Sequence, residues 1–264
     1  MARLTIRHHT RYDYEKPVRF GAQRLLVRPR DGHAIRLISA SLELSPQGRT
    51  RWIYDAMGNC LCWFQPAGEA SRLEITSRLV IDRFPAPLAP ITLDDPRSAL
   101  PLVYDLRDRI ALAPLVTPVT EDPCGIVLHW LRSHLGAADE PVLDLIRRLN
   151  DAIHAEFDYR AREAEGIQSP VQTLELKSGA CRDFAWLMVE TLRRIGCAAV
   201  FVTGYLNSPN QQTRGAGATH AWCEAFLPGL GWLEFDPTNG LVESSDLIRV
   251  GGTRTPEEAS PVAG

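Results

Sequence analysis

Residues 179–196 read GACRDFAWLMVETLRRIG, and this stretch decides the fold. Apolar side chains recur between Phe184 and Ile195 at close to helical spacing. Gly196 is a typical helix stop, and the two arginines just before it suit the negative end of the helix dipole. The pattern therefore predicts a helix with Cys181 at its first position or one residue outside it.

The beginning of a helix is a place where a cysteine can react. Its unpaired N–H groups and its positive dipole end stabilise a thiolate, and the same groups can hold the oxyanion of a tetrahedral intermediate. A free cysteine is nevertheless most often a small buried apolar residue. The position of Cys181 alone favours that structural role, and a catalytic role needs a base nearby.

Two short strands separated by a Pro-Gly turn follow this helix. They are THAWCEAF at 219–226 and GWLEFD at 231–236. A turn centred near residue 228 would place His220 directly opposite Asp236, on one face of an antiparallel pair. A register slip of one residue would break this pairing.

Cys181, His220 and Asp236 together supply a nucleophile, a base and an orienting carboxylate. An imidazole accepts the thiol proton near neutral pH, and a carboxylate on its other nitrogen fixes the tautomer. Two alternatives stay open, because Glu234 is a competing carboxylate on the same face and Asp236 is also suited to cap the turn after it. The three residues in helix–strand–strand order favour thiol catalysis.

Three aromatic residues are further candidates for the substrate cleft and the oxyanion site. Trp222 and Trp232 share the predicted face of the hairpin with His220, and Tyr159 precedes the nucleophile, where its hydroxyl could donate to an oxyanion. We expect neither a metal nor another cofactor, because the C-x-C pair at 60–62 has no second cysteine or histidine pair nearby to complete a zinc site.

The chain resembles the bacterial branch of the transglutaminase-like superfamily, a papain-related group of cysteine enzymes. The phrases that carry the resemblance are FDY at 157–159, SGACRDFA at 178–185, VTGYL at 202–206, HAW at 220–222, PGLGW at 228–232 and FDPTNG at 235–240. They span roughly residues 145–250, and residues 1–85 resemble the β-rich region that accompanies this core. The resemblance implies that Cys181, His220 and Asp236 are nucleophile, base and orienting acid.

The same resemblance implies an α+β fold. A β-sandwich-like N-terminal region is followed by a papain/transglutaminase-like core, in which the helix bearing the nucleophile packs on an antiparallel sheet. Two features depart from the family pattern. Arg182 stands where many relatives carry Gln, and residues 261–264 end the chain without the closing hydrophobic strand of many relatives. A truncated chain and a shorter natural protein both fit the second departure.

The predicted organisation has three parts. Residues 1–85 form the β-rich region, 86–120 an irregular connection and 121–264 the catalytic core. The expected strands of the first part and the expected helices after the connection are, in order, 3–14, 21–28, 36–45, 49–54, 60–65 and 72–82, then 122–135 and 140–156. We expect Asp139 to be the N-cap of the second helix, and the stretch 207–218 to form a rim or lid over the site.

Bulk properties exclude several classes of function. A net charge of −3 gives no reason to expect nucleic acid, and no apolar run approaches the ~20 residues that span a bilayer. Without a charged-then-apolar leader or a disulfide pattern among its six cysteines, the chain is expected in the cytoplasm. The oligomeric state is not readable.

The function that fits best is a cysteine enzyme that attacks a peptide or related amide and forms a thioester. Water as acceptor makes it a protease or amidase, and this is the preferred reading because water is always present. A lysine amine as acceptor makes it a protein-glutamine transglutaminase. A third alternative is a non-catalytic protein-binding module of the same fold, which is disfavoured because all three members of the triad are present.

Overall fold

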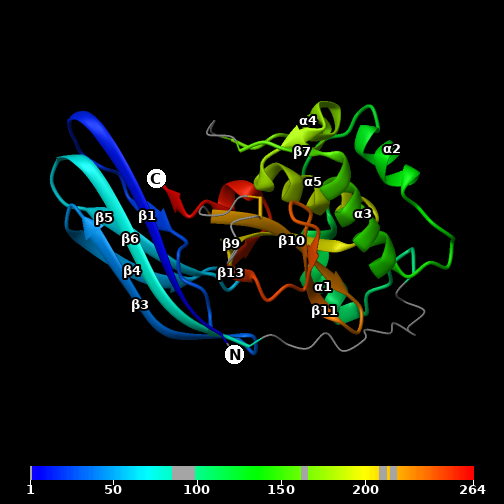
Figure 1. Cartoon of the computed structure of the whole chain (residues 1–264), viewed down its shortest axis with the longest axis horizontal. Coiled ribbons are helices and arrows are strands. Elements are labelled where there is room, and N and C mark those ends of the chain that lie inside the picture. Colours follow the sequence, from blue (N-terminus) through cyan, green and yellow to red (C-terminus); the bar gives the residue numbers. More distant parts are fainter. Residues whose placement is uncertain (1, 85–98, 162–165, 208–212, 215–218) are drawn as a thin grey trace. The chain divides into compact units, whose positions relative to one another are not determined.

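The computed structural model describes residues 2–84, 99–161, 166–207, 213–214 and 219–264 (Figure 1). The chain divides into two compact units. Unit 1 comprises residues 1–87, 248–252 and 259–264, and unit 2 comprises residues 88–247 and 253–258. Residues 86–98 of the expected connection and most of the stretch expected to form a rim lie outside the described residues.

Unit 1 is built from two antiparallel sheets. One sheet has the strand order β1-β6-β3, with β1 (Ala2–Val18), β6 (Ala70–Arg83) and β3 (Ile35–Ser45). The other has the order β14-β2-β5-β4, with β14 (Val262–Ala263), β2 (Gln23–Leu25), β5 (Cys60–Pro66) and β4 (Gly48–Tyr54). Six of these strands coincide with those expected from the sequence. The last residues of the chain also form a strand, which pairs with β2.

The core of unit 1 lies between its two sheets. Cys62 and Phe64 of β5 are fully buried together with Leu73 and Ile75 of β6. The strands alternate buried and exposed residues, as in β5, because successive side chains point to opposite faces of a sheet. This arrangement is the predicted β-sandwich.

Unit 2 combines helices with a mainly antiparallel sheet. The helices are α1 (Leu106–Val116), α2 (Ile126–Ser133), α3 (Val142–Glu156), α4 (Pro170–Leu176) and α5 (Cys181–Arg194). The sheet has the order β12-β11-β10-β9-β13, with β12 (Leu241–Val242), β11 (Gly231–Asp236), β10 (Thr219–Leu227), β9 (Ala198–Leu206) and β13 (Leu247–Thr253). A short parallel pair, β7 (Asp158–Tyr159) and β8 (Ser178–Gly179), precedes α5, and a 3₁₀ helix (Pro256–Ala259) follows β13.

Helix α5 is the central element of unit 2 and packs against β9 and β10. It begins at Cys181, ends at Arg194 and is followed by Gly196 with a φ of +78°, as its sequence predicts. The expected packing of the helix that carries Cys181 on an antiparallel sheet is therefore confirmed. No helix among the described residues is long and apolar enough to cross a membrane.

Three local features differ from those expected. Helix α1 lies within the segment expected to be irregular, and it contains Pro114. Helix α4 was not expected either, although Ser169 and Gln172 form a capping box at its start. The N-cap of α3 is Pro141 instead of Asp139, because the helix begins at Val142, two residues later than expected.

Candidate active site

Cys181 occupies the first helical position of α5, after an N-cap at Ala180. The buried carboxylate of Asp183 fixes this turn, since it accepts the Ala180 N–H at 2.8 Å and the Gln168 N–H at 2.8 Å. Gly179 is required just before it, because a Cβ there would lie 2.9 Å from the Cβ of Asp183. The thiol is thus held, half-buried, at the positive end of the helix.

The β10–β11 hairpin has a register different from the expected one. Leu227 pairs with Gly231 and Cys223 with Phe235, so the turn is centred on Gly229, where φ is +81°. The expected four-residue connection is a three-residue one, which moves every partner by two positions. A shift of two keeps each side chain on its face, because the side-chain period along a strand is two residues.

His220 is therefore a diagonal neighbour of Asp236 rather than its opposite residue. The two side chains still meet: the Nε2 atom of His220 lies 2.8 Å from the Oδ2 atom of Asp236, and both side chains are fully inaccessible to solvent. The contact expected between these two residues is confirmed, although the pairing that was expected to produce it is wrong.

The electrostatics of this pair favour an imidazolium beside a carboxylate. Burial lowers the pKa of His220, but the charge and hydrogen bond of Asp236, and then Cys181, outweigh burial and raise that pKa to about 10. Burial likewise opposes ionisation of Asp236, yet His220, Asn239 and the Thr238 N–H hold the pKa of its carboxyl below the ordinary value. Both shifts favour the ionised form of the pair.

Asp236 also caps the turn that follows it, so both readings of this residue hold. Its Oδ1 accepts the Thr238 N–H at 2.9 Å, and its Oδ2 accepts the Asn239 amide at 2.9 Å as well as the His220 proton. Three donors therefore fix the carboxylate in one orientation.

Sequence reasoning missed the residues that hold this turn in place. The Asn239 amide oxygen accepts the Arg214 N–H at 2.9 Å, and Nδ1 of His154 lies 2.9 Å from the carbonyl oxygen of Thr238. Asn239 lies within the FDPTNG phrase, whose Asx-rich turn was the available signal.

The other imidazole nitrogen of His220, Nδ1, is not engaged by Asp236. Nδ1 is buried and has no hydrogen-bond partner within the described part of the chain. Because Nε2 faces a carboxylate, that nitrogen carries the proton, and Nδ1 accepts a proton in the neutral ring or donates one in the imidazolium. The thiol of Cys181 is close enough to stabilise the charged ring.

Tyr159 belongs to the same neighbourhood. Strand β7 pairs in parallel with β8 and sets Tyr159 beside Gly179, two residues before Cys181. Burial, and then the proximity of Cys181, raise the pKa of the Tyr159 hydroxyl, so it stays protonated and can donate a hydrogen bond.

The two tryptophans of the hairpin have different positions. Trp222 is fully buried and stacks against His220, with ring centroids 6.0 Å apart, and its Nε1 donates to Glu234 at 3.3 Å. Glu234 therefore binds the tryptophan, and Asp236 binds the histidine. Trp232 pairs with Phe226, six residues or roughly 20 Å along β10 from His220, so it does not line the site.

Metal-ligand geometry does not accompany this site. Among the described residues, no group of three histidine, cysteine, aspartate or glutamate side chains is arranged to hold a metal ion. Cys223 faces away from His220 and is fully buried, and burial raises the pKa of its thiol well above the ordinary value.

Comparisons with known proteins agree with this architecture. The family described as bacterial transglutaminase-like N-terminal region matches residues 4–82, and the transglutaminase-like superfamily matches residues 130–237. An uncharacterized protein of Mycobacterium tuberculosis is 29% identical over 276 residues, which cover 99% of this chain and 87% of the relative. A second, from Mycobacterium leprae, is 26% identical over 269 residues, which cover 100% of this chain and 93% of that relative.

A solved structure has the same fold. The crystal structure of a proposed cysteine protease from Cytophaga hutchinsonii matches with a TM-score of 0.76 at 19% identity, covering 99% of this chain and 84% of that chain. At this level of identity the similarity establishes the fold and says nothing further about the reaction.

Proposed function

Since the chain belongs to the transglutaminase-like superfamily, a family of cysteine-based enzymes, we propose that it hydrolyses a peptide or related amide through a thioester on Cys181. His220 is the acid and base of this reaction, and Asp236 orients it. The observation that carries the proposal is the buried 2.8 Å hydrogen bond between His220 Nε2 and Asp236 Oδ2, which leaves Nδ1 for the nucleophile.

In the resting enzyme the thiol proton of Cys181 resides on Nδ1 of His220. The raised pKa of His220, about 10, favours this imidazolium at neutral pH, and the Asp236 carboxylate balances its charge. The positive end of α5 stabilises the thiolate that remains. The site is therefore charged and ready to attack before substrate arrives.

Acylation begins when the thiolate sulfur attacks the carbonyl carbon of the amide. A C–S bond forms and the carbonyl π electrons move to oxygen, whose negative charge the Cys181 N–H and the Tyr159 hydroxyl can stabilise. Collapse of the intermediate breaks the C–N bond. The proton on Nδ1 of His220 goes to the departing nitrogen, which leaves as an amine and leaves a thioester.

Deacylation reverses these roles with water in place of the amine. The now neutral His220 removes a proton from water as the oxygen attacks the thioester carbon. The C–S bond breaks, a carboxylic acid departs, and the thiolate–imidazolium pair is restored. Asp236 remains a carboxylate throughout and keeps the imidazole in the tautomer that both steps need.

Measuring iodoacetamide alkylation of Cys181 against pH, in wild type and in His220→Ala, tests the proposed ion pair. Cys181 should react rapidly below pH 7 in wild type and lose that reactivity without His220. Cys124, an exposed free cysteine, is the internal control, and its rate should be the same in both proteins. Equal pH profiles for Cys181 and Cys124 would refute the catalytic pair.

The acceptor is tested separately. A library of peptide amides is incubated with the enzyme alone and with a primary amine, and the release of acid and of amine-linked product is followed by mass spectrometry. Hydrolysis predicts acid as the main product even with the amine present. Amine-linked product in excess would favour the transglutaminase alternative while leaving the thioester mechanism intact.

A cytoplasmic location and a protein or peptide substrate complete the proposal. All six cysteines are free, which suits a reducing compartment. Fractionation of cells that produce the protein tests the location directly, and recovery outside the cytoplasmic fraction would contradict it.

A further inference from the structure

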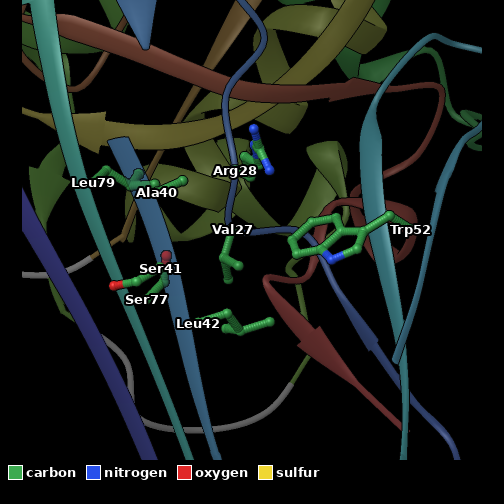
Figure 2. Close-up of a pocket in the computed structure, with 8 residues that line it drawn as sticks. All are labelled: Val27, Arg28, Ala40, Ser41, Leu42, Trp52, Ser77 and Leu79. Carbon is green, nitrogen blue, oxygen red and sulfur yellow. The ribbon is translucent and has the colours of Figure 1, made fainter. Parts of the chain in front are cut away.

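A small pocket in unit 1 is lined by residues of both sheets, among them Leu42, Trp52 and Leu79 (Figure 2). Its volume is about 30 Å³, which is room for about one water molecule. A metabolite or a peptide side chain does not fit into a space of this size. The contacts that extend the proposed function lie in unit 2, around the turn that follows Asp236.

The side-chain amide of Asn239 forms hydrogen bonds on two sides. Its oxygen, Oδ1, accepts the backbone N–H of Arg214 at 2.9 Å, and its nitrogen, Nδ2, donates to Oδ2 of Asp236 at 2.9 Å. Nδ2 also donates to the carbonyl oxygen of Arg214 over a longer distance, 3.4 Å. One side chain therefore joins the backbone of residue 214 to the carboxylate that binds His220.

The N–H of Arg214 determines which way round this amide lies. An asparagine amide has an acceptor at one end and donors at the other, and a half-turn about its last bond exchanges them. An N–H needs the oxygen opposite it, so the nitrogen is left to face Asp236. The opposite orientation would set an oxygen against the carboxylate. The backbone of residue 214 thus selects the donor that the Asp236 carboxylate requires.

The side chain of Arg214 ties this backbone to the end of a helix. Its Nη1 atom donates to the carbonyl oxygen of His154 at 3.2 Å. His154 lies in the last turn of α3, where carbonyl groups have no partner within the helix and the negative end of the dipole favours a cation. Residue 214 is therefore fixed to α3 as well as to Asn239.

His154 also holds the turn after Asp236 through its ring. Nδ1 lies 2.9 Å from the carbonyl oxygen of Thr238, and because a carbonyl can only accept, Nδ1 carries a proton and donates it. Gly240, with a φ of +66°, packs closely on this ring, since a Cβ there would lie 3.2 Å from Cδ2 of His154. The end of α3, residue 214 and the turn are each bonded to the other two.

We infer that Arg214 is a positioning residue that acts through Asn239 on the Asp236 carboxylate, with His154 as the anchor on α3. The guanidinium fixes residue 214, the N–H of that residue orients the Asn239 amide, and the amide holds the carboxylate toward Nε2 of His220. The inference rests on the proposed function, because Asp236 needs an orientation only if His220 takes part in the reaction.

Two simpler roles of Arg214 predict different results. If Arg214 only ties residue 214 to α3, its loss lowers the free energy of unfolding and leaves the reactivity of the site unchanged. If it acts by its charge alone, its loss raises the pKa of Asp236 whether or not Asn239 is present. Action through Asn239 requires that the effect of Arg214 disappear when Asn239 is removed.

The probe is iodoacetamide, and its rate of alkylation of Cys181 in the full chain is followed against pH by mass spectrometry. The rate should fall at low pH, because a protonated Asp236 no longer supports the imidazolium of His220. Asn239→Ala removes a hydrogen bond that lowers the pKa of Asp236, so the fall should move up by about one pH unit. Arg214→Ala should move it up by about 0.5 unit, or about threefold in rate at a fixed pH on that limb.

The double variant, Arg214→Ala with Asn239→Ala, decides between the roles. Its profile should coincide with that of Asn239→Ala alone, because the amide through which Arg214 acts is already absent. Shifts that add would show that Arg214 acts independently of Asn239, and they would overturn the inference.

Variants on α3 supply the rescue and the control. His154→Ala should move the profile up, whereas His154→Asn should leave it close to that of wild type, since the Asn amide nitrogen can take the place of Nδ1 as donor to Thr238. Arg147→Ala makes the same change of charge at an exposed arginine that pairs with Asp144, and its profile should match wild type. Melting curves establish that each variant is folded.

An unmoved profile in Arg214→Ala, or an equal shift in Arg147→Ala, would also overturn the inference. Failure of the proposed function itself looks different, because it is seen in wild type before any variant is compared. Cys181 would then react like the exposed Cys124 at every pH. A wild-type Cys181 that is reactive at low pH, with variants that leave its profile unmoved, would contradict the role of Arg214 alone.

Discussion

The two ends of helix α5 both bury charge, but they satisfy it differently. At the C-terminal end, Glu190 accepts from Thr120, Arg193 and Arg194, and Arg193 also donates to the carbonyl oxygens of Ala199 and Leu115. At the N-terminal end, the buried His220 and Asp236 are paired, and Nδ1 of His220 has no partner among the described residues.

This difference separates a structural network from a reactive one. Burying a charge is costly unless it is paired and hydrogen-bonded, and the Glu190–Arg193 network satisfies its groups internally. An unsatisfied buried nitrogen is costly in the same way, and it persists where a reaction uses it. Variants at one end of α5 should therefore remove activity, and variants at the other end should remove stability.

The largest effect is expected for Cys181→Ala. Turnover should fall by about 10⁴-fold or more, because the thioester can no longer form, and thermal stability should be nearly unchanged. Steady-state kinetics and a melting curve measure both quantities, with Cys124→Ala as the control that keeps full activity. Appreciable turnover by the Cys181→Ala protein would rule out the mechanism.

Asp236→Asn should come next. The amide presents its N–H groups to His220 and favours the wrong tautomer, so turnover should fall by about 10³–10⁴-fold while substrate binding changes little. Glu234→Gln is the matched control, since Glu234 binds Trp222 and not His220. Equal losses in the two variants would contradict the assignment of Asp236 as the orienting acid.

Arg193→Met tests the other end of the helix. It removes one of the two arginines that pair with the buried Glu190, each at 3.1 Å, together with the donor to the Ala199 and Leu115 carbonyl oxygens, and we expect a loss of about 3–5 kcal/mol in the free energy of unfolding. In a chain of this size that is a fall of on the order of 10 °C in Tm. The exposed Arg147→Ala should cost less than about 0.5 kcal/mol. A large loss of turnover in folded Arg193→Met protein would break the comparison.

Asn239→Ala should have a smaller effect. It removes one of three donors to the Asp236 carboxylate, a charge-assisted hydrogen bond worth about 1.5–3 kcal/mol, so turnover should fall by roughly tenfold. Because the pKa of Asp236 should rise, the acid limb of the pH–rate profile should move to higher pH. A loss of stability with an unmoved profile would make Asn239 purely structural.

A pH dependence of stability is expected as well. The folded-state pKa of His220, about 10, lies above its unfolded value of about 6.5, so its contribution is complete below pH ~6.5 and is lost as pH rises through about 10. The pKa of Asp236 is depressed, so its contribution is present above pH ~4 and lost as pH falls.

Melting temperatures of wild type and His220→Ala across this range measure the effect. The difference between them should be largest near pH 5–6 and should shrink toward pH 10. The difference between wild type and Arg193→Met should stay constant over the same range, because a guanidinium does not titrate there. A His220→Ala difference that grows with pH would contradict the direction of the shift.

Much of this architecture could be predicted because local patterns and final structure agree. In α5 and in the strands of unit 1, the spacing of apolar residues follows the face that becomes buried. The sequence therefore predicts these elements directly. The expected register was wrong by two residues, but the contact of His220 with Asp236 was still predicted correctly. A shift of two residues leaves every side chain on the same face of the strand.

Other features depend on contacts that a local pattern does not contain. Trp232 lies on the same face of the hairpin as Asp236, as expected. Its distance from His220, however, depends on where the turn is centred. The contacts of His154 and Arg214 join residues far apart in the chain. Helix α1 has little amphipathic pattern and an internal proline, so tertiary packing and not propensity determines it.

The pairing of β14 with β2 has a consequence for the order in which the protein folds during synthesis. Residues 262–263 complete a sheet whose other strands were made first, within residues 23–66. The ribosome therefore finishes every helix and strand of unit 2 before that sheet can close. The N-terminal region must wait with one edge of β2 open, and it is at this stage that a nascent chain would benefit most from a chaperone.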